Sequence, residues 1–532
     1  MQIIFNGKEL QLNPDSKVAL TLQINNVADI SKPNTSFTNS FKVPKGAKND
    51  LIMEFLGVNG SNTRIPYSQN KVTMLEDSIV LVNDGYAVVD STSDPRNYAL
   101  NIYGSEKTFF QVIKNYTLQD VYPDTNVMWT APNLLNYVTS MTDWCLPVAQ
   151  YNADAYHTSF AQAGITGAYT RTKALETSPH FFVKKLFESI FSYLGYTVSY
   201  PMSGDNVFNR LVIPSQKGVK ELSVVYGANF NIKQCVFNKG CDILIKELMQ
   251  RYGLLIKVDE LKKKVTFTRF TDLLTTSPIL DWTDKYIEMK NEKYSIGSYA
   301  QTNYYKYSED ILDDGVANIS IIIPSFGANA LQGSFNIDNA TLDKENTVFE
   351  STFSKAKAWG EKIITGTTEA FGIASQGRLF TPSTGLLGYP LFNVAENELS
   401  DFDNPASEKK NRENEFQLMY LKTIEDPVNF GIMDNFGVYQ QLVTSQAKVC
   451  THDNIGFQKF LDDNYSGVIS LLDNMVVTKV MMNLSVLDIY QFDFHKRIYL
   501  QQYASYFYVN RISNWQKNKL TEVELIKIPA II

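Results

Sequence analysis

The stretch YFYVNRISNWQKNKLTEVELIKI, Tyr506–Ile528, decides the fold class. Phe507 and Val509 alternate with polar residues, and Val523 and Leu525 do the same beyond a lysine-rich turn. This spacing predicts a hairpin with one apolar face. A terminal strand with an apolar face must pair and become buried, because it otherwise offers an aggregating edge. We therefore expect the last strand to lie inside the wall of a β-barrel.

A second unusual stretch, DISKPNTSFTNSFKVPKGAKN, covers Asp29–Asn49. It follows a run at Ala19–Val27 in which apolar and polar residues alternate as in a half-buried strand. Pro33 and Pro44 lack an amide donor, and each favours extended geometry in the residue before it. We expect this segment to be extended and rigid, without a central position in a sheet.

The composition is that of a globular protein, with 532 residues, 44% of them hydrophobic and 20% charged. The length suggests about three or four domains, or two large ones with insertions. No run of apolar residues is long enough to predict a membrane span, and the first ten residues do not resemble a signal peptide. A net charge of -7 argues against a sequence-specific nucleic-acid partner. The four cysteines show no paired spacing, so we expect them to be reduced.

Hydrophobic periodicity divides the chain into three regions, with boundaries expected at residues 1–123, 124–286 and 287–532. The first and third regions are predicted to be mainly strand, and the third carries a long polar insertion at about residues 328–415. The first region is expected to hold a hairpin whose turn lies at Asn83, Asp84 and Gly85.

Two units of helix, glycine and strand predict an α+β middle region. In the first unit, Ser178 is expected to cap a helix that has Pro179 in its first turn. In the second, Asp242 is expected to cap a helix that ends at Gly253, where the strand LLIKVD begins. The predicted fold class is thus β-rich α+β.

Few residues suggest chemistry. Paired carboxylates for glycoside hydrolysis or calcium binding could come from one acidic group: Glu396, Glu398, Asp401 and Asp403. Cys450 and His452 could ligate zinc, but no second pair of ligands lies nearby in the sequence. A solvated loop is the favoured interpretation of both groups, and no catalytic motif is present. We expect no cofactor and no metal.

The two quoted stretches resemble the opening and closing segments of tail proteins encoded by phages and prophages of Bacteroidetes. The element order also resembles the baseplate hub of phage tails. The resemblance implies two tube-like β-barrel domains with the α+β region between them. It implies a structural protein of the virion tail, assembled in the host cytoplasm, that forms a hub ring continuing or closing the tail tube. The implied partners are two further copies in a trimer and other tail or baseplate proteins.

The resemblance gives the opening stretch a role. A candidate interface consists of Ser36, Phe37, Thr38, Phe41 and Pro44. As an extended arm, the stretch would lie across a neighbouring subunit, where its two rings would be buried and its hydroxyls would pair with backbone groups. Alternatively, it would plug the end of its own barrel.

Two other function classes remain open. A tail-associated hydrolase of cell wall or polysaccharide would use carboxylates of the acidic group described above. A carbohydrate-binding tail protein would use some of the 30 tyrosines as stacking platforms. Turnover of purified cell wall would favour the first class, and glycan binding without turnover the second.

Overall fold

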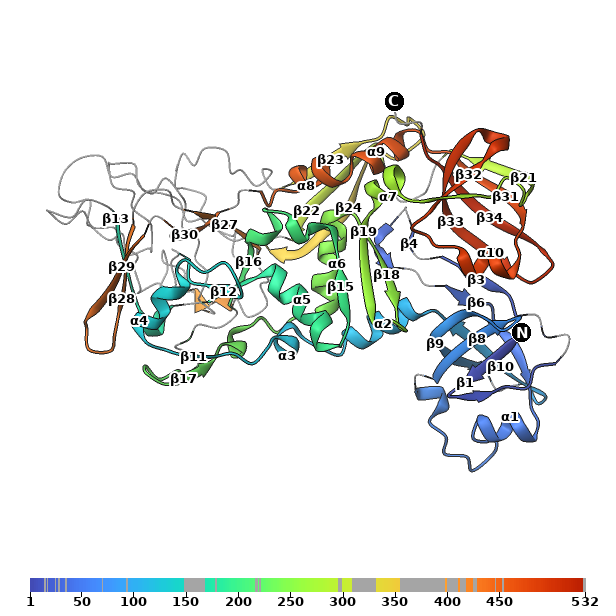
Figure 1. Cartoon of the computed structure of the whole chain (residues 1–532), viewed down its shortest axis with the longest axis horizontal. Helices are drawn as coiled ribbons and strands as arrows, with labels where there is room; N and C mark the ends of the chain where they lie inside the picture. The colour runs from blue at the N-terminus through green and yellow to red at the C-terminus, as the bar shows by residue number, and fades with distance from the viewer. Residues whose placement is uncertain are drawn as a thin grey trace.

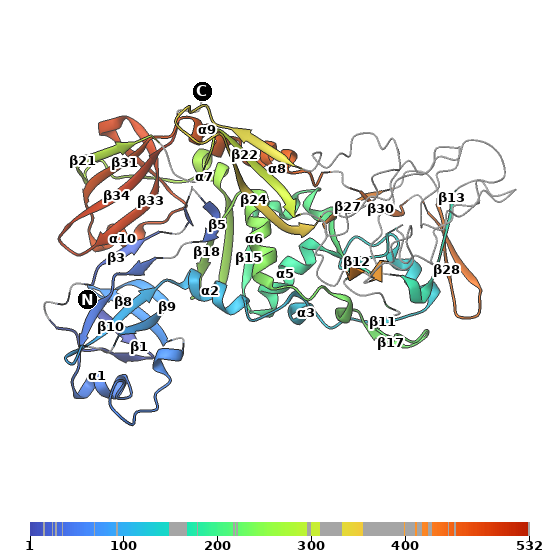
Figure 2. The same cartoon turned by 180° about the vertical axis from the view of Figure 1, so that it is seen from behind.

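The structure is a computed structural model of the whole chain. It describes every residue except 14–15, 17, 24, 27–28, 34–35, 69, 92–93, 148–167, 178, 216–218, 220–221, 295–298, 309–331, 355–397, 400–409, 412–417, 424–427, 445, 452–453 and 530–532. Figures 1 and 2 show an elongated molecule, with a large curled sheet at one end, helices and small sheets in the middle, and a hairpin at the other end. The β-rich α+β class is confirmed.

Among the described residues, the large sheet has 14 strands and combines strands from the N-terminal and C-terminal regions. The N-terminal region contributes eight of them: β1 (Gln2–Phe5), β2 (Lys8–Glu9), β3 (Leu20–Leu22), β6 (Phe37–Thr38), β7 (Phe41–Pro44), β8 (Asn70–Glu76), β9 (Ile79–Ser91) and β10 (Asn97–Tyr103). The C-terminal region contributes six: β20 (Ile279–Asp281), β21 (Tyr286–Lys293), β31 (Val477–Asn483), β32 (Arg497–Leu500), β33 (Ser505–Trp515) and β34 (Leu520–Lys527). The two sets join where β3 pairs with β33.

The predicted closing hairpin is confirmed as β33 and β34, which pair antiparallel. Its apolar face is fully buried, since Phe507, Val509, Val523 and Leu525 are at most 1% exposed. The last strand, β34, lies between β33 and β31 and so has a neighbour on both sides. Its interior position in the sheet follows from the buried face, as the alternation predicts.

The hairpin predicted in the N-terminal region has a different turn. Asp77 and Ser78, both with positive φ, connect β8 to β9, and β9 continues without a break through Asn83, Asp84 and Gly85. Gly85 serves packing instead, because a Cβ at this position would lie 2.5 Å from the carbonyl oxygen of Tyr103. The turn prediction was wrong because a glycine needed for close packing resembles a turn glycine in the sequence.

The middle region is built around two helices, α5 (Val183–Tyr193) and α6 (Cys241–Tyr252). The end of α6 is as predicted, with Gly253 in the left-handed conformation (φ 57°) before β18 (Leu254–Asp259), which pairs with β19 (Lys264–Arg269). Both predicted starts were wrong. A strand, β14 (His180–Phe182), precedes α5 and places Phe182 at its N-cap, and Gly240 rather than Asp242 precedes α6.

Two hydrophobic cores account for the elongated shape. One fills the large sheet and includes residues of both its N-terminal and C-terminal strands, such as Phe5, Phe41, Val509 and Trp515. The other fills the middle region. It takes in α5 and α6 together with β22 (Thr302–Ser308), β23 (Gly333–Asn336), β24 (Glu345–Ser354), α8 (Phe457–Asn464) and α9 (Ser466–Asp473). Chain segments on both sides of the predicted polar insertion therefore pack into the middle core.

The end of the molecule opposite the large sheet is formed by small sheets (Figure 2). In one of them, β28 (Val428–Met433) lies between β13 (Ala168–Lys173) and β29 (Tyr439–Thr444). A short helix, α4 (Ala131–Leu134), packs against β28 and β29, and a two-stranded sheet of β11 (Asn126–Met128) and β17 (Asn229–Asn231) lies beside it. Within the described part of the chain, no helix combines the length and apolarity needed to cross a bilayer.

Candidate functional site

One part of the opening stretch, β6, lies in the middle of the large sheet, contrary to the expectation that the stretch has no central position. β6 pairs with β10 on one side and with β3 on the other. β6 has only two residues, Phe37 and Thr38, and contains no proline. Pro44 ends β7, which among the described strands pairs only with β10. Pro33 ends β5 (Asp29–Pro33), which pairs with β4 (Asn25–Asn26) in a separate two-stranded sheet. Both prolines thus lie at strand ends, where proline is tolerated.

The five residues of the candidate interface have different environments. Phe41 is 3% exposed and belongs to the core of the large sheet, where burial of its ring contributes about 1.5–3 kcal/mol. Thr38 is also buried, and its Oγ1 accepts a hydrogen bond from the N–H of Ile102 at 2.9 Å. Ser36, Phe37 and Pro44 are only partly buried. The contact of this stretch with another subunit stays a prediction.

The place where the opening stretch meets the closing hairpin is here called the seam. It comprises Thr21, Phe37, Asn39, Arg511 and Asn514. The N–H of Asn514 donates to Thr21 Oγ1 at 3.2 Å, and Asn514 Oδ1 accepts from Asn39 Nδ2 at 2.7 Å. The Arg511 guanidinium lies 6.0 Å from the centre of the Phe37 ring. The seam therefore joins the two ends of the chain through side chains as well as through the β3–β33 pair.

The backbone of Asn514 is in the left-handed region, with a φ of 54°. Asparagine adopts this conformation more readily than most residues. The register between β3 and β33 shifts at Leu20–Leu22, so the strands of the seam do not form a regular ladder. Asn514 thus supplies side-chain and backbone hydrogen bonds at an irregular part of the pairing.

An ion pair near the seam links two turns. Lys517, between β33 and β34, lies 2.5 Å from Asp77 and 3.8 Å from Glu76, at the turn between β8 and β9. These acidic partners raise the pKa of Lys517, and the largest cause is the hydrogen bond that Lys517 donates to Asp77. Because Lys517 is well exposed, the pair contributes little free energy by itself. It adds a charged contact to the polar contacts of the seam.

The sequence-predicted chemical groups do not form a described site. The side chains of the acidic group (Glu396, Glu398, Asp401 and Asp403) lie outside the described residues, as do those of Cys450 and His452. Among the described residues, no three His, Cys, Asp or Glu side chains gather in a way that could hold a metal ion. Cys145, Cys235 and Cys241 are buried free thiols. Burial raises the pKa of each of these thiols, which makes them poor nucleophiles.

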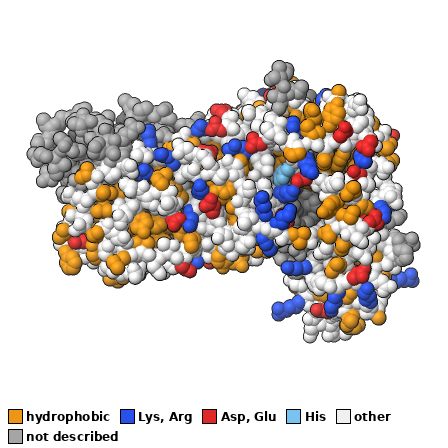
Figure 3. Space-filling model, in the orientation of Figure 1, with side chains coloured by type: hydrophobic (Ala, Val, Ile, Leu, Met, Phe, Trp, Pro, Cys, Tyr) orange, Lys and Arg blue, Asp and Glu red, His pale blue; other side chains and the backbone are white. Residues whose placement is uncertain are grey.

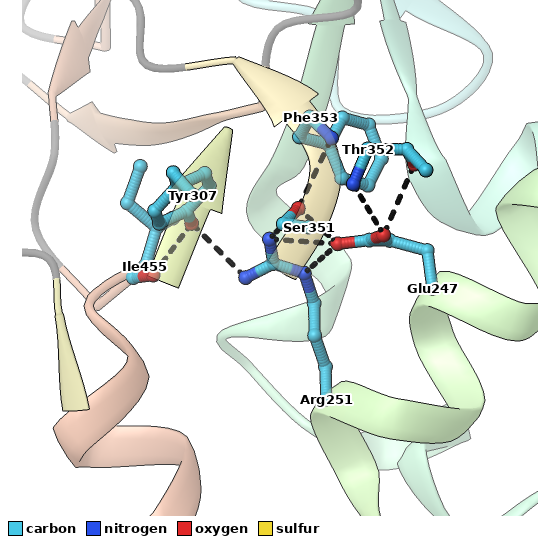
Figure 4. Close-up of polar contacts among 7 residues, drawn as sticks. All are labelled: Glu247, Arg251, Tyr307, Ser351, Thr352, Phe353 and Ile455. Carbon is cyan, nitrogen blue, oxygen red and sulfur yellow. Dashed lines mark hydrogen bonds and ion pairs between the residues drawn. The ribbon is translucent and has the colours of Figure 1, made fainter. Parts of the chain in front are cut away.

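A buried charge pair in the middle core was missed by the sequence reasoning (Figure 4). Arg251 is 0% exposed, and its Nη2 lies 3.1 Å from Glu247 Oε1 in the same helix, α6. Arg251 also donates to the Tyr307 hydroxyl and to Ser351 Oγ, both at 3.0 Å. Glu247 Oε2 accepts from the backbone N–H of Thr352 at 3.1 Å. The pair thus binds α6 to β22 and β24.

Aromatic rings surround this pair. The Arg251 guanidinium lies 4.5 Å from the ring centre of Phe457 and 4.8 Å from that of Tyr307. Burial alone lowers the pKa of Arg251, but Tyr307 and Glu247 outweigh burial and raise it. No buried polar atom of Glu247 or Arg251 lacks a hydrogen-bond partner. A buried charge pair can mark an active site, but with its polar groups satisfied internally this one organises the core.

A sequence signal for the pair exists. Glu247 and Arg251 are four residues apart on the apolar helix α6, where both would be expected on the solvent side. Instead both are buried, because β22 and β24 cover this face of the helix. The covering strands cannot be inferred from the helix sequence alone.

No protein-family model and no curated protein sequence matches the chain. Among solved structures, the chain overlaps with the prophage MuSo2 43 kDa tail protein from Shewanella oneidensis, at 9% identity and a TM-score of 0.35, over 100% of both chains.

Two further overlaps are similar in extent. The tail protein from Neisseria meningitidis MC58 matches at 7% identity and a TM-score of 0.36, over 100% of this chain and 96% of that one. The prophage tail protein gp18 from Listeria monocytogenes EGD-e matches at 8% identity and a TM-score of 0.31, over 99% and 94%. These TM-scores are too low to establish a shared fold, and we base no assignment on them.

Proposed function

We propose that this chain is a structural component of a phage tail that forms a hub ring continuing or closing the tail tube. One observation carries the proposal. The two sequence stretches that resemble tail proteins, from opposite ends of the chain, meet at the seam in one sheet. In that sheet β3 lies between β6 of the opening stretch and β33 of the closing hairpin, and the two stretches contact each other through Asn39 and Asn514. Two segments that each resembled the family by chance would have no reason to lie in contact.

The arrangement of the β regions supports a role in the wall of the proposed hub ring. The N-terminal and C-terminal strands lie side by side at one end of the molecule and share one core (Figure 1). In the proposed hub, each β region is a tube-like barrel domain, and three subunits place six such units around a channel. The division into domains at residues 1–123, 124–286 and 287–532 is part of this proposal, as is assembly in the host cytoplasm into the virion tail.

The proposed ring also gives the partly buried residues of the opening stretch a role. Ser36 and Phe37 are not enclosed by the core of the chain's own sheet. In a ring, Ser36 and Phe37 would contact the next copy. The exposed edge of the sheet would face other tail or baseplate proteins.

Electron microscopy of the purified protein tests the proposal directly. We expect rings with a central channel and threefold or pseudo-sixfold symmetry. Single elongated particles at every protein concentration would contradict the ring. Turnover of purified cell wall by the same preparation would instead favour the hydrolase class.

A further inference from the structure

Two basic side chains meet at one of the small sheets, which includes β16 (Leu211–Pro214), β27 (Met419–Thr423) and β30 (Lys448–Thr451). Arg210 directly precedes β16, and Lys448 begins β30 opposite Thr423. Lys448 Nζ and Arg210 Nη1 both donate to Thr423 Oγ1, each at 3.3 Å. Figure 3 shows Lys and Arg side chains gathered over this part of the molecule. The fold thus brings two cationic groups to one hydroxyl.

Lys448 is buried with neutral acceptors only. It is 5% exposed, and its second hydrogen bond goes to the carbonyl oxygen of Gln446 at 2.8 Å. Burial lowers the pKa of Lys448, the charge of Arg210 lowers it further, and the Cys145 thiol acts in the opposite direction. Within the described part of the chain, neither Lys448 nor Arg210 forms an ion pair with a carboxylate. A buried charge without a counterion is costly, so this position favours an anion from outside the chain.

The carboxylate nearest to Arg210 along the described chain serves its own turn. Asp205 Oδ1 accepts hydrogen bonds from the N–H groups of Val207 at 2.7 Å and Phe208 at 3.4 Å. The Nε of Arg210 donates instead to the amide oxygen of Asn206 at 3.3 Å. Arg210 is only partly buried, so its guanidinium forms the more accessible side of the cluster and Lys448 the buried side.

The hydrogen-bonding capacity left over in this cluster consists of donors. A lysine ammonium has three N–H groups and a guanidinium has five, and each of these two side chains uses two of them. The Thr423 hydroxyl accepts from both cations and keeps its own proton to donate. Two positive charges and these donors match a phosphate group, which carries about -1.5 to -2 charges at pH 7. A carboxylate has one charge and two oxygens, so it would satisfy fewer of them.

We propose that Lys448, Arg210 and Thr423 bind a phosphate group, either free phosphate or a phosphate monoester. The ammonium of Lys448 neutralises charge on the buried side, and the guanidinium of Arg210 offers its planar donors to two phosphate oxygens. The bound anion separates the two cations and replaces their repulsion with attraction. This site lies away from the large sheet, and the proposal does not depend on the hub ring.

The test is calorimetric titration of the full chain with inorganic phosphate, at an ionic strength held constant with potassium chloride. Arg210→Gln and, independently, Lys448→Met each remove one positive charge from the site. Lys496→Gln is the matched control, because Lys496 also donates to a backbone carbonyl, that of Gln491 at 3.2 Å, but lies at the sheet end. Circular dichroism confirms that each variant is folded, and Arg210→Gln alone suffices if the buried Lys448→Met does not fold.

We expect one phosphate to bind per wild-type chain. Each site variant should weaken binding by about tenfold or more, and Lys496→Gln should change it by less than about twofold. No saturable binding by the wild-type chain, or equal binding by the wild-type chain and Arg210→Gln, would overturn the proposal. Equally tight binding of acetate would overturn it in favour of a carboxylate site. Titration with glucose 6-phosphate then distinguishes the two sources, because a site that takes monoesters binds it and a site for free phosphate does not.

A further variant tests for a counterion within the chain. Glu425 and Asp426 follow Thr423 in the sequence and lie outside the described residues. We expect the double variant Glu425→Gln/Asp426→Asn to bind phosphate as the wild-type chain does. Phosphate binding that appears only in this double variant would show that the chain supplies its own anion, which would overturn the proposal.

Discussion

At the sheet end of the molecule, exposed positions carry paired charges, whereas the hairpin of β28 and β29 at the opposite end carries one charged residue, Asp434. Lys479 lies 3.2 Å from Glu522 and 3.7 Å from Glu524, and Lys290 of the outermost strand β21 lies 3.5 Å from Glu522. Charged side chains and bulges on an edge strand discourage unwanted pairing, and β21 has both. The β28–β29 hairpin has a regular register, and its Asp434 carboxylate accepts hydrogen bonds within its own turn. The difference indicates that the two ends meet different surroundings.

The largest expected effect comes from removing the closing strand. Deletion of Glu522–Ile532 takes away most of β34, which pairs with both β33 and β31. The apolar face of those strands would then be exposed, so we expect no soluble folded protein. The measurement is the soluble fraction after expression. A soluble, monodisperse truncated chain would show that the sheet end tolerates loss of an interior strand.

The same substitution at the two ends compares their roles most directly. Phe41→Ala should lower the free energy of unfolding by about 3–5 kcal/mol, because the ring is buried in the core. Phe436→Ala should change it by less than about 0.5 kcal/mol, because that ring is exposed. Denaturant unfolding followed by tryptophan fluorescence measures both. If the two variants lost similar amounts of unfolding free energy, the Phe436 ring would have to be part of a core.

A smaller effect is expected at the seam. Asn514→Ala should destabilise the protein by about 1–2 kcal/mol, since it loses the bond to Asn39 and places alanine in the left-handed region. Asn514→Gly keeps the backbone relaxed and should cost about half as much. Hydrogen exchange of the β3 and β33 amides follows the change locally. If the two variants are destabilised equally, the left-handed backbone conformation of Asn514 does not affect stability.

The smallest expected effect is a pH dependence at the sheet end. Burial lowers the pKa of His495, which lies 3.7 Å from Asp493. The unfolded chain therefore takes up a proton near the ordinary histidine pKa of about 6.5, while the folded chain does so only at lower pH. Stability should be complete above that value and fall by on the order of 1 kcal/mol as the pH drops from about 7 to 5.

His495→Asn is the control for this effect, because asparagine does not titrate in this range. Unfolding transitions at several pH values give the measurement. An unchanged pH dependence in the variant would assign the effect to other groups.

Local patterns predicted the closing hairpin and the end of α6, because both depend on residues close together in the sequence. The alternation through Phe507 and Val509 specifies a strand, and Gly253 specifies the end of a helix. Neither needs contacts with residues that are distant in the sequence. The start of α5 was different. Pro179 is a common helix-start residue, but pairing of His180–Phe182 with β12 (Trp144–Cys145) and β16 (Leu211–Pro214) takes these residues into a sheet.

The central position of the opening stretch could not be predicted for a similar reason. A two-residue strand such as Phe37–Thr38 has no periodicity of its own, and its neighbours β3 and β10 determine its place. The candidate interface was predicted as one unit, but the sheet divides it. Phe41 and Thr38 belong to the buried interior, and Phe37 lies at the seam beside Arg511.

The seam also sets an order of events during protein synthesis. Thr21 and Asn514, which contact each other, are 493 residues apart in the sequence. At a translation rate of about 5–20 residues per second, roughly half a minute to more than a minute and a half passes before β33 can reach β3. During that interval, the N-terminal strands hold an open edge next to other growing chains. Correct assembly of this sheet thus depends on how long the unpaired edge of β3 avoids other contacts before β33 pairs with it.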